Sequence, residues 1–420
     1  MEEFNLRREK LFDLLEDHSI AIIYAGAAKI RSEDENYPFL ANRHFFYLTG
    51  IEQENSVLLL IKTVGETKTY LFMDEYDERK ERWTGKRLAF DTASEISQVS
   101  NVYAISNFKS VLDMALKEKV YGEIEHAYFD LSDELKVGPN KSTKTVAEEF
   151  KQEYPTIDII DVYKLITSLR IVKSNLEINN LIEATNITNN GINDLLIHMH
   201  LGMYEHVLSD RFEYYGKTHD RRELSFDTII ATGKDATILH HPISQQTKAI
   251  ESGELILFDL GYKYKGYCAD ISRTFPVDGV FNEYQKKVYQ AVLTTNKQVI
   301  KCIRPGLTIA DLQEFAKGVL KSEAVKYGLI KDGEDISKYY IHNVSHFLGL
   351  DTHDVGDRNT PLVPGNVITV EPGLYFVETG VGVRIEDDVL VTENEAVVLS
   401  KGIVKEIADI EKLLKSKRSV

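Results

Sequence analysis

The chain has little cysteine, little tryptophan and no long apolar run. Its 420 residues include two cysteines, Cys268 and Cys302, and one tryptophan, Trp83. Two cysteines cannot build a disulfide framework, so the composition favours a reducing, cytoplasmic location. No apolar run approaches the ~18 residues of a membrane span. The acidic start, Met1-Glu2-Glu3-Phe4, predicts that there is no signal peptide.

Positive charge is also in deficit, because 50 Lys and Arg face 66 Asp and Glu, which leaves a net charge of −16. Nucleic acid requires a basic surface to meet its phosphates, so we expect neither nucleic acid nor membrane as a partner. Much of the acid excess serves solubility. Several acids nevertheless lie within apolar strands, where solubility does not explain them.

The first part of the chain predicts an α/β domain, because short apolar runs alternate with amphipathic stretches. The length allows two domains, and we place them at residues 1–165 and 166–420. The predicted strands of the first are 20–24, 45–49, 57–61, 69–73, 102–105 and 127–131, and the helices are 6–17, 77–87 and 108–118.

The second part predicts an α+β domain that begins with a long helix carrying an apolar stripe from Leu176 to Leu196. Thr308 and Asp311 form a capping-box pattern at the start of a later helix. Predicted strands are 228–232, 255–261, 267–276, 367–376 and 381–392, and predicted helices are 282–303 and 308–327.

Two acids lie in a predicted hairpin of this second part. Asp259 ends the run Leu255-Ile256-Leu257-Phe258, and Asp270 lies in the strand that follows a turn near Gly266. A turn at residues 264–265 would pair the acids directly, whereas a turn at 265–266 would make them diagonal neighbours. Both registers place the carboxylates on one face of the hairpin. Bare carboxylates there repel one another, and a divalent cation would relieve the repulsion.

A second hairpin repeats the arrangement. Glu371 and Glu386 each lie in an apolar strand, and the midpoint between them falls at residues 378–379, beside Gly380. Arg384 shares a strand face with Glu386 because two residues separate them. One arginine cannot offset four buried carboxylates, so the pattern predicts two divalent cations.

Three histidines, His342, His346 and His353, fall within twelve residues of a chain that has twelve in total. His346 is a candidate nitrogen ligand that completes a five-residue, two-metal site. We expect His342, His353 and His240 around the substrate, as neutral or protonated groups.

These motifs resemble the pita-bread metallopeptidases of the aminopeptidase P and prolidase type. The matching contexts are Phe-Asp-Leu-Gly at Asp259, Ala-Asp-Ile-Ser-Arg-Thr-Phe at Asp270, Ser-His-Phe-Leu-Gly-Leu-Asp at His346, Val-Glu-Pro-Gly-Leu-Tyr at Glu371 and Val-Arg-Ile-Glu-Asp at Glu386. The first domain resembles the N-terminal domain of aminopeptidase P in Tyr37-Pro38-Phe39, in Phe45-Phe46-Tyr47-Leu48-Thr49-Gly50 and around Trp83.

The resemblance implies a C-terminal pita-bread catalytic domain with two metal ions, most often manganese. Asp259 would chelate one ion, and Asp270 and Glu386 would bridge both. His346 and Glu371 would bind the other ion.

The resemblance also implies roles around the metals. His240 matches a histidine on the substrate side, and His342 and His353 match histidines beside the metals and the substrate carbonyl. Arg384 matches an arginine near the carboxylates. Trp83 matches an aromatic that the first domain contributes to substrate binding. Relatives are often homodimers or homotetramers.

The implied activity is hydrolysis of the Xaa-Pro bond at the N-terminus of a peptide. A prolidase, which accepts only Xaa-Pro dipeptides, is the nearest alternative. A methionine aminopeptidase is disfavoured by the large first domain. A catalytically inactive binding module and a creatinase-like hydrolase are disfavoured by the complete ligand set.

Three features depart from the family pattern. Glu386 follows Glu371 by fifteen residues, which resembles compact prolidases as much as aminopeptidases P. Two extra residues lie between His240 and Asp259, so His241 competes for the histidine role. Cys268 lies two residues before Asp270, either as a packing residue or as a thiol that makes the enzyme sensitive to oxidation.

Overall fold

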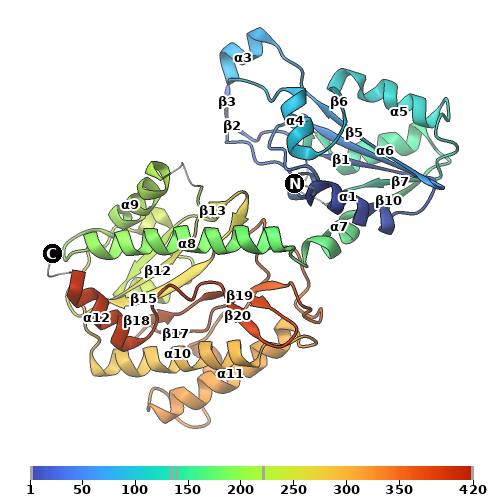
Figure 1. Cartoon of the computed structure of the whole chain (residues 1–420). Coiled ribbons are helices and arrows are strands. Elements are labelled where there is room, and N and C mark those ends of the chain that lie inside the picture. Colours follow the sequence, from blue (N-terminus) through green and yellow to red (C-terminus); the bar gives the residue numbers. More distant parts are fainter. Residues whose placement is uncertain (1–2, 133–135, 139–140, 220–222, 418–420) are drawn as a thin grey trace. The chain divides into compact units, whose positions relative to one another are not determined.

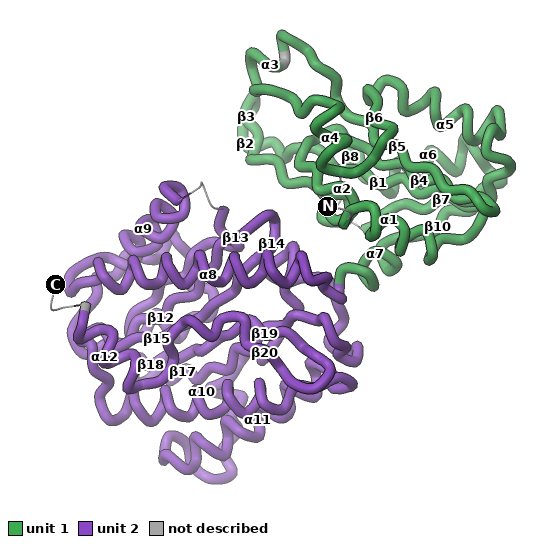
Figure 2. The backbone as a smooth tube through the Cα atoms, in the orientation of Figure 1, with its two compact units in different colours: residues 1–170 green, residues 171–420 purple. Residues whose placement is uncertain are grey.

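The computed structural model describes residues 3–132, 136–138, 141–219 and 223–417. The chain divides into two compact units, residues 1–170 and 171–420 (Figure 2). The expected division after residue 165 falls inside helix α7 (Tyr163–Arg170), which belongs to the first unit. None of the helices in these described ranges has the length and apolarity that crossing a membrane requires.

Unit 1 is built on a six-stranded mixed sheet, as the α/β prediction required. The strand order is β10-β7-β1-β4-β5-β6, with antiparallel pairs β1–β4 and β4–β5 and parallel pairs elsewhere. The strands of the sheet are β1 (Ser19–Tyr24), β4 (Val57–Thr63), β5 (Glu66–Met73), β6 (Asn101–Ala104), β7 (His126–Phe129) and β10 (Asp158–Asp161). The other helices and strands of the unit are α1 (Glu3–Leu14), α2 (Arg43–Thr49), α3 (Glu78–Thr84), α4 (Phe90–Ser97), η1 (Ile105–Asn107), α5 (Phe108–Leu116), α6 (Thr143–Glu153), β2 (Ile30–Ser32), β3 (Glu35–Asn36), β8 (Lys136–Gly138) and β9 (Lys141–Ser142).

The strand predicted at residues 45–49 is wrong, because this segment is helix α2. Asn42 caps its start, since the side-chain oxygen accepts hydrogen bonds from the backbone N–H groups of His44 and Phe45. Gly50 ends it at φ 69°, a left-handed conformation that suits glycine. The aromatic run looked like a strand because the short helix is buried on nearly all sides.

Unit 2 carries three long helices whose starts are fixed by capping boxes. Ser174 with Glu177, Asn282 with Gln285, and Thr308 with Asp311 each exchange side-chain and backbone hydrogen bonds, which confirms the predicted box at Thr308. The helices are α8 (Asn175–His198), α9 (Glu205–Thr218), α10 (Glu283–Cys302), α11 (Ile309–Lys326) and α12 (Ile407–Lys417), with 3₁₀ turns η2 (Gly233–Thr237), η3 (Ile243–Gln245) and η4 (Ile336–Lys338).

Most strands of unit 2, including β12, β15 and β17 to β20, lie between α8 on one side and α10 and α11 on the other (Figure 1). The strands of the unit form the sheets β11-β12-β15 and β16-β19-β20 and the pairs β13–β14 and β17–β18. All six residues of β12 and of β15 are buried, and Phe258 and Phe275 pack in the same core. The strands are β11 (Ile229–Thr232), β12 (Leu255–Leu260), β13 (Lys263–Tyr264), β14 (Tyr267–Cys268), β15 (Ile271–Pro276), β16 (Val367–Val370), β17 (Gly373–Phe376), β18 (Val381–Arg384), β19 (Asp387–Val391) and β20 (Ala396–Val398).

Candidate metal centre

The first predicted hairpin forms with its turn at Lys265 and Gly266. Tyr264 pairs with Tyr267, and both turn residues have positive φ, 48° and 84°. This register continues along the strands and pairs Asp259 with Ser272. Asp270 is therefore the diagonal neighbour of Asp259, which is the second of the two predicted arrangements.

The second hairpin also forms, but its ladder is interrupted at the two acids. Gly373 pairs with Arg384 on one side of the interruption, and Val370 pairs with Asp387 on the other. The same register places Glu371 opposite Glu386. Their backbone N–H groups bond to other segments instead, at Val344 O (2.8 Å) and Ser272 O (3.0 Å) respectively. The break frees both side chains to leave the regular sheet.

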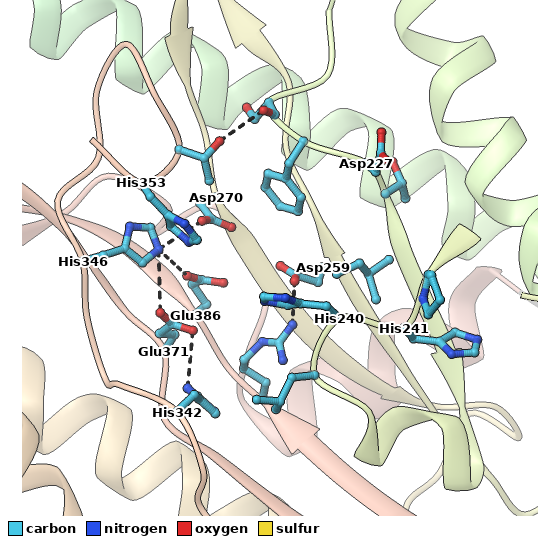
Figure 3. A pocket seen from close by; sticks show the side chains of 18 of the residues that line it. Asp227, His240, His241, Asp259, Asp270, His342, His346, His353, Glu371 and Glu386 are labelled. Carbon is cyan, nitrogen blue, oxygen red and sulfur yellow. Dashed lines mark hydrogen bonds and ion pairs between the residues drawn. The ribbon is translucent and has the colours of Figure 1, made fainter. Parts of the chain in front are cut away.

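His346 brings the two hairpins together. Its Nε2 lies 3.3 Å from Asp270 Oδ2, 3.7 Å from Glu371 Oε1 and 4.0 Å from Glu386 Oε1. Asp270, His346 and Glu386 offer ligand atoms that all lie within 4.8 Å of one another. Figure 3 shows these side chains and Asp259 pointing into one space. The structure thus brings together the five residues predicted as metal ligands.

The carboxylates of this cluster lack the positive charge that burial requires. Burial and the neighbouring acids raise the pKa values of Asp259 and Glu386, and burial raises that of Glu371. Burial alone would lower the pKa of His346, but the bond to Asp270 and the charge of Glu371 raise it to about 9. A set of oxygen donors and one imidazole in this state fits divalent cations.

Arg384 supplies part of the missing charge and is held by Ser272. The guanidinium donates to Asp259 Oδ2 at 2.6 Å and to Ser272 Oγ at 2.6 Å. Ser272 Oγ also lies 3.0 Å from Asp259 Oδ1 and 2.8 Å from Glu386 Oε2. Sequence reasoning missed Ser272, although it lies two residues beyond Asp270 and so shares its strand face.

His342 is held in one tautomer by its neighbours. Its Nδ1 lies 2.7 Å from Asn343 O, which only accepts, so Nδ1 carries the hydrogen. Its Nε2 then accepts from the hydroxyl of Tyr375 at 2.8 Å, and that hydroxyl accepts from Arg384 Nη1 at 3.2 Å. Burial, with the charge of Arg384, lowers the pKa of His342 to about 3, so the ring is neutral.

A cavity of about 570 Å³ opens beside the cluster, within the usual range for ligand pockets. His240 and His353 line it with the metal-ligand candidates. Figure 3 shows His240 beside Asp259 and His241 farther from the cluster. His241 is 2% exposed, and its Nε2 lies 3.2 Å from Glu205 Oε2. This geometry favours His240 over His241 for the substrate side.

Comparison with known proteins identifies the architecture. Residues 179–393 match metallopeptidase family M24, and residues 4–121 match the N-terminal domain of aminopeptidase P. The chain belongs to the M24 metallopeptidases. It is therefore a hydrolase with an aminopeptidase P-type first unit and a pita-bread second unit, as predicted.

Relatives within the M24 family match along the whole chain. The Xaa-Pro aminopeptidase of Haemophilus influenzae is 32% identical over 98% of this chain and 97% of its own length. A structure from Bacillus anthracis is 39% identical with a TM-score of 0.93, and covers 99% of this chain and 98% of that one. Aminopeptidase P from E. coli with the inhibitor Pro-Leu is 30% identical with a TM-score of 0.89, and covers 100% and 99%.

Two further residues singled out in the sequence, Trp83 and Cys268, differ in exposure. Trp83 lies on α3 of the first unit, and its side chain is 89% exposed. Cys268 is fully buried in β14, and burial raises the pKa of its thiol to about 12. A thiol in that state packs rather than reacts, because the thiolate is the reactive form.

Proposed function

We propose that this protein is a two-metal exopeptidase that hydrolyses the bond between the N-terminal residue of a peptide and a following proline. The observation that carries the proposal is the convergence of five ligand candidates on one cavity, in a chain that matches named Xaa-Pro aminopeptidases over its full length. Buried acids with raised pKa values support a site that is completed by cations.

Asp259, Asp270, His346, Glu371 and Glu386 would hold two divalent ions, for which we propose manganese. Within this set, Asp270, His346 and Glu386 offer ligand atoms that lie within 4.8 Å of one another. When bound, such ions lower the pKa of a water molecule and polarise a peptide carbonyl. Mainly oxygen donors with one imidazole suit this class of ion.

Glu371 is the proposed proton carrier between the attacking water and the leaving proline nitrogen. Burial raises its pKa above the ordinary carboxyl value, which brings it nearer to working pH. Its Oε2 also lies 3.6 Å from His342 Nδ1. Both ring nitrogens of His342 are occupied by Asn343 and Tyr375, so His342 would lie beside this carboxylate as a fixed, neutral ring and would not donate to it.

His240 and His353 are the proposed partners of the substrate carbonyl, because both line the cavity. The His353 ring packs edge-on to His346, with centroids 4.4 Å apart. Burial lowers the pKa of His353, so it would meet the carbonyl as a neutral donor. Trp83 remains a proposed substrate contact, since its exposed indole is free to pack on a proline ring.

The decisive experiment compares Xaa-Pro dipeptides with Xaa-Pro-Yaa tripeptides, in manganese and in a chelator. We expect release of the N-terminal residue from the tripeptide, and its loss in chelator. Cleavage of dipeptides alone would favour a prolidase, an alternative supported by the fifteen-residue step from Glu371 to Glu386. No cleavage of either peptide would favour a binding module.

We also propose a cytoplasmic location and a homodimer or homotetramer. The first rests on the two free cysteines, Cys268 and Cys302, and the second on the resemblance to oligomeric relatives. Sedimentation of the purified protein tests the assembly.

A further inference from the structure

We propose a third divalent-metal site in unit 2, formed by Glu205, Asp235 and His241 and separate from the catalytic ligands. Each residue offers one ligand atom, and the three atoms lie within 4.8 Å of one another. The residues come from the start of α9, from turn η2 and from the segment after His240. Within the described ranges, this triad and the set Asp270, His346 and Glu386 are the two groups with such an arrangement.

The imidazole of His241 provides the first independent sign of a ligand. The side chain is 2% exposed, and Nε2 lies 3.2 Å from Glu205 Oε2. Nδ1 is buried and has no hydrogen-bond partner among the described residues. Buried polar atoms are normally satisfied, and each exception requires an explanation. His241 Nε2 and Glu205 Oε2 lie about as far apart as two ligands of one ion, and Asp235 offers a third ligand atom within 4.8 Å of both.

Charge provides the second sign. Glu205 is fully buried, and its Oε1 accepts from the N–H (2.6 Å) and the hydroxyl (2.7 Å) of Thr232. Asp235 adds a second, half-buried carboxylate. The ammonium of Lys248 lies 3.5 Å from Thr232 O, but it pairs with Glu254. A divalent cation would balance the two acids, whose burial without compensation is costly.

The donor set indicates the kind of ion. One imidazole nitrogen and two carboxylate oxygens are a zinc-type set, with a fourth position left for water. A purely structural bond between His241 and Glu205 accounts for Nε2 alone. It leaves the approach of Asp235 without a role. We therefore take Zn²⁺ as the probe.

Occupation of this site would fix a segment that borders the catalytic cavity. Turn η2, which carries Asp235, packs closely on β18, because a Cβ on Gly382 would lie 2.0 Å from Ala236 O. Arg384 ends that strand. His240 and His241 both line the cavity. An ion held at the third site would thus restrain both Arg384 and His240 beside the substrate, and so modulate turnover.

The test uses the full chain with both Asp270 and Glu386 changed to Ala, which weakens the catalytic centre. After chelation, Zn²⁺ is titrated by calorimetry, and bound zinc is counted by elemental analysis after dialysis. We expect one ion per chain. Adding His241→Asn should weaken its binding at least about tenfold, the scale on which even indirect ligand contacts act. His206→Asn, one residue beyond Glu205 on α9, is the matched control and should leave the affinity unchanged.

A second variant guards against misfolding. Asp235→Asn changes a half-buried position and should also weaken zinc binding, with the circular dichroism spectrum retained. Hydrogen exchange should show zinc-dependent protection of residues 233–243, and this protection should vanish in both variants. No bound zinc, or equal affinity with and without His241 and Asp235, would overturn the site. Failure to cleave Xaa-Pro peptides would leave this titration untouched, so the two proposals fail separately.

Discussion

Glu386 and Asp387 are neighbours in the chain, but they occupy opposite electrostatic situations. Asp387 accepts from Arg273 at 2.7 Å, from Ser400 at 2.6 Å and from Lys405 at 2.5 Å. Although burial opposes the shift, these partners lower its pKa well below the ordinary value. Glu386 faces other acids, and burial together with Asp270 raises its pKa. Asp387 begins β19, whereas Glu386 lies in the break between β18 and β19, so the two neighbours face different surroundings.

The difference teaches how to recognise a metal ligand among buried acids. Both residues are nearly inaccessible, so burial does not separate them. The partners do, because Asp387 accepts from two cations, Arg273 and Lys405. Glu386 instead shares the single imidazole of His346 with Asp270 and Glu371. A buried carboxylate whose charge the protein leaves unmatched marks the place where a cation from outside completes the structure.

The largest effect should come from removing the unmatched acids. Asp270→Ala or Glu386→Ala should lower kcat/KM for an Xaa-Pro-Yaa peptide by at least about 10³-fold, because bound metal supplies several kcal/mol of transition-state stabilisation. Metal content per chain should fall in parallel. Glu314→Gln, which changes an exposed acid, is the control and should keep its metal. Normal turnover in either alanine variant would refute the metal centre.

Asp387, the acid that is paired with cations, should mainly affect the stability of the fold. Asp387→Asn removes the charge that faces the buried Arg273 and the half-buried Lys405, and breaking a buried pair such as that with Arg273 is worth about 3–5 kcal/mol. Urea unfolding measures the loss. Glu314→Gln removes the exposed pair with Lys317 and should change stability by less than about 1 kcal/mol. Equal losses of stability in the two variants would show that the pairing of Asp387 does not stabilise the fold more than an exposed ion pair does.

The two kinds of acid should also respond to pH in opposite directions. The raised pKa values of Asp259, Glu371 and Glu386 mean that the metal-free fold binds their protons more tightly than the unfolded chain does. Their contribution to the stability of the metal-free fold is therefore most favourable below about pH 4. It is lost as pH rises toward their raised pKa values. Asp387 stabilises the fold fully above about pH 4, and this stabilisation is lost as pH falls below that value toward its lowered pKa.

Metal-free protein should accordingly be more stable at pH 5–6 than at pH 8, and added manganese should remove that difference. Thermal unfolding across this pH range, with chelator and with manganese, provides the measurement. We expect a difference on the order of 1 kcal/mol or more. Glu386→Gln should reduce the dependence of the metal-free protein's stability on pH. If the stability of the metal-free protein instead rose steadily up to pH 8, the carboxylates of the metal centre would not carry uncompensated charge.

The sequence predicted the acids better than their surroundings. Alternation and turn spacing were enough to place Asp259 with Asp270 and Glu371 with Glu386, because register follows from the turn. The turn itself stayed open between two positions, since Lys265 adopts a positive φ that non-glycine residues seldom take. Local pattern does not report such a conformation.

Contacts between residues far apart in the chain could not be predicted from the sequence pattern. Glu205 on α9 and His241 meet through tertiary packing, although 36 residues of the chain separate them. Tyr375 joins His342 to Arg384 in the same way. The helix at residues 43–49 was missed because burial on nearly all sides hid its period, although Asn42 and Gly50 carried the capping signals.

The smallest effect should come from Cys268, which lies beside the unmatched acids without sharing their chemistry. Its thiol is fully buried, contacts Leu350 O at 3.7 Å and has its pKa raised to about 12 by burial. Oxidation proceeds through the thiolate, so Cys268→Ala should leave the rate of inactivation by peroxide unchanged. Cys302→Ala, at a half-buried site, is the matched control. Protection by the first substitution and not by the second would show that the strand beside Asp270 opens to solvent, and that the closed packing drawn around the acids does not persist in solution.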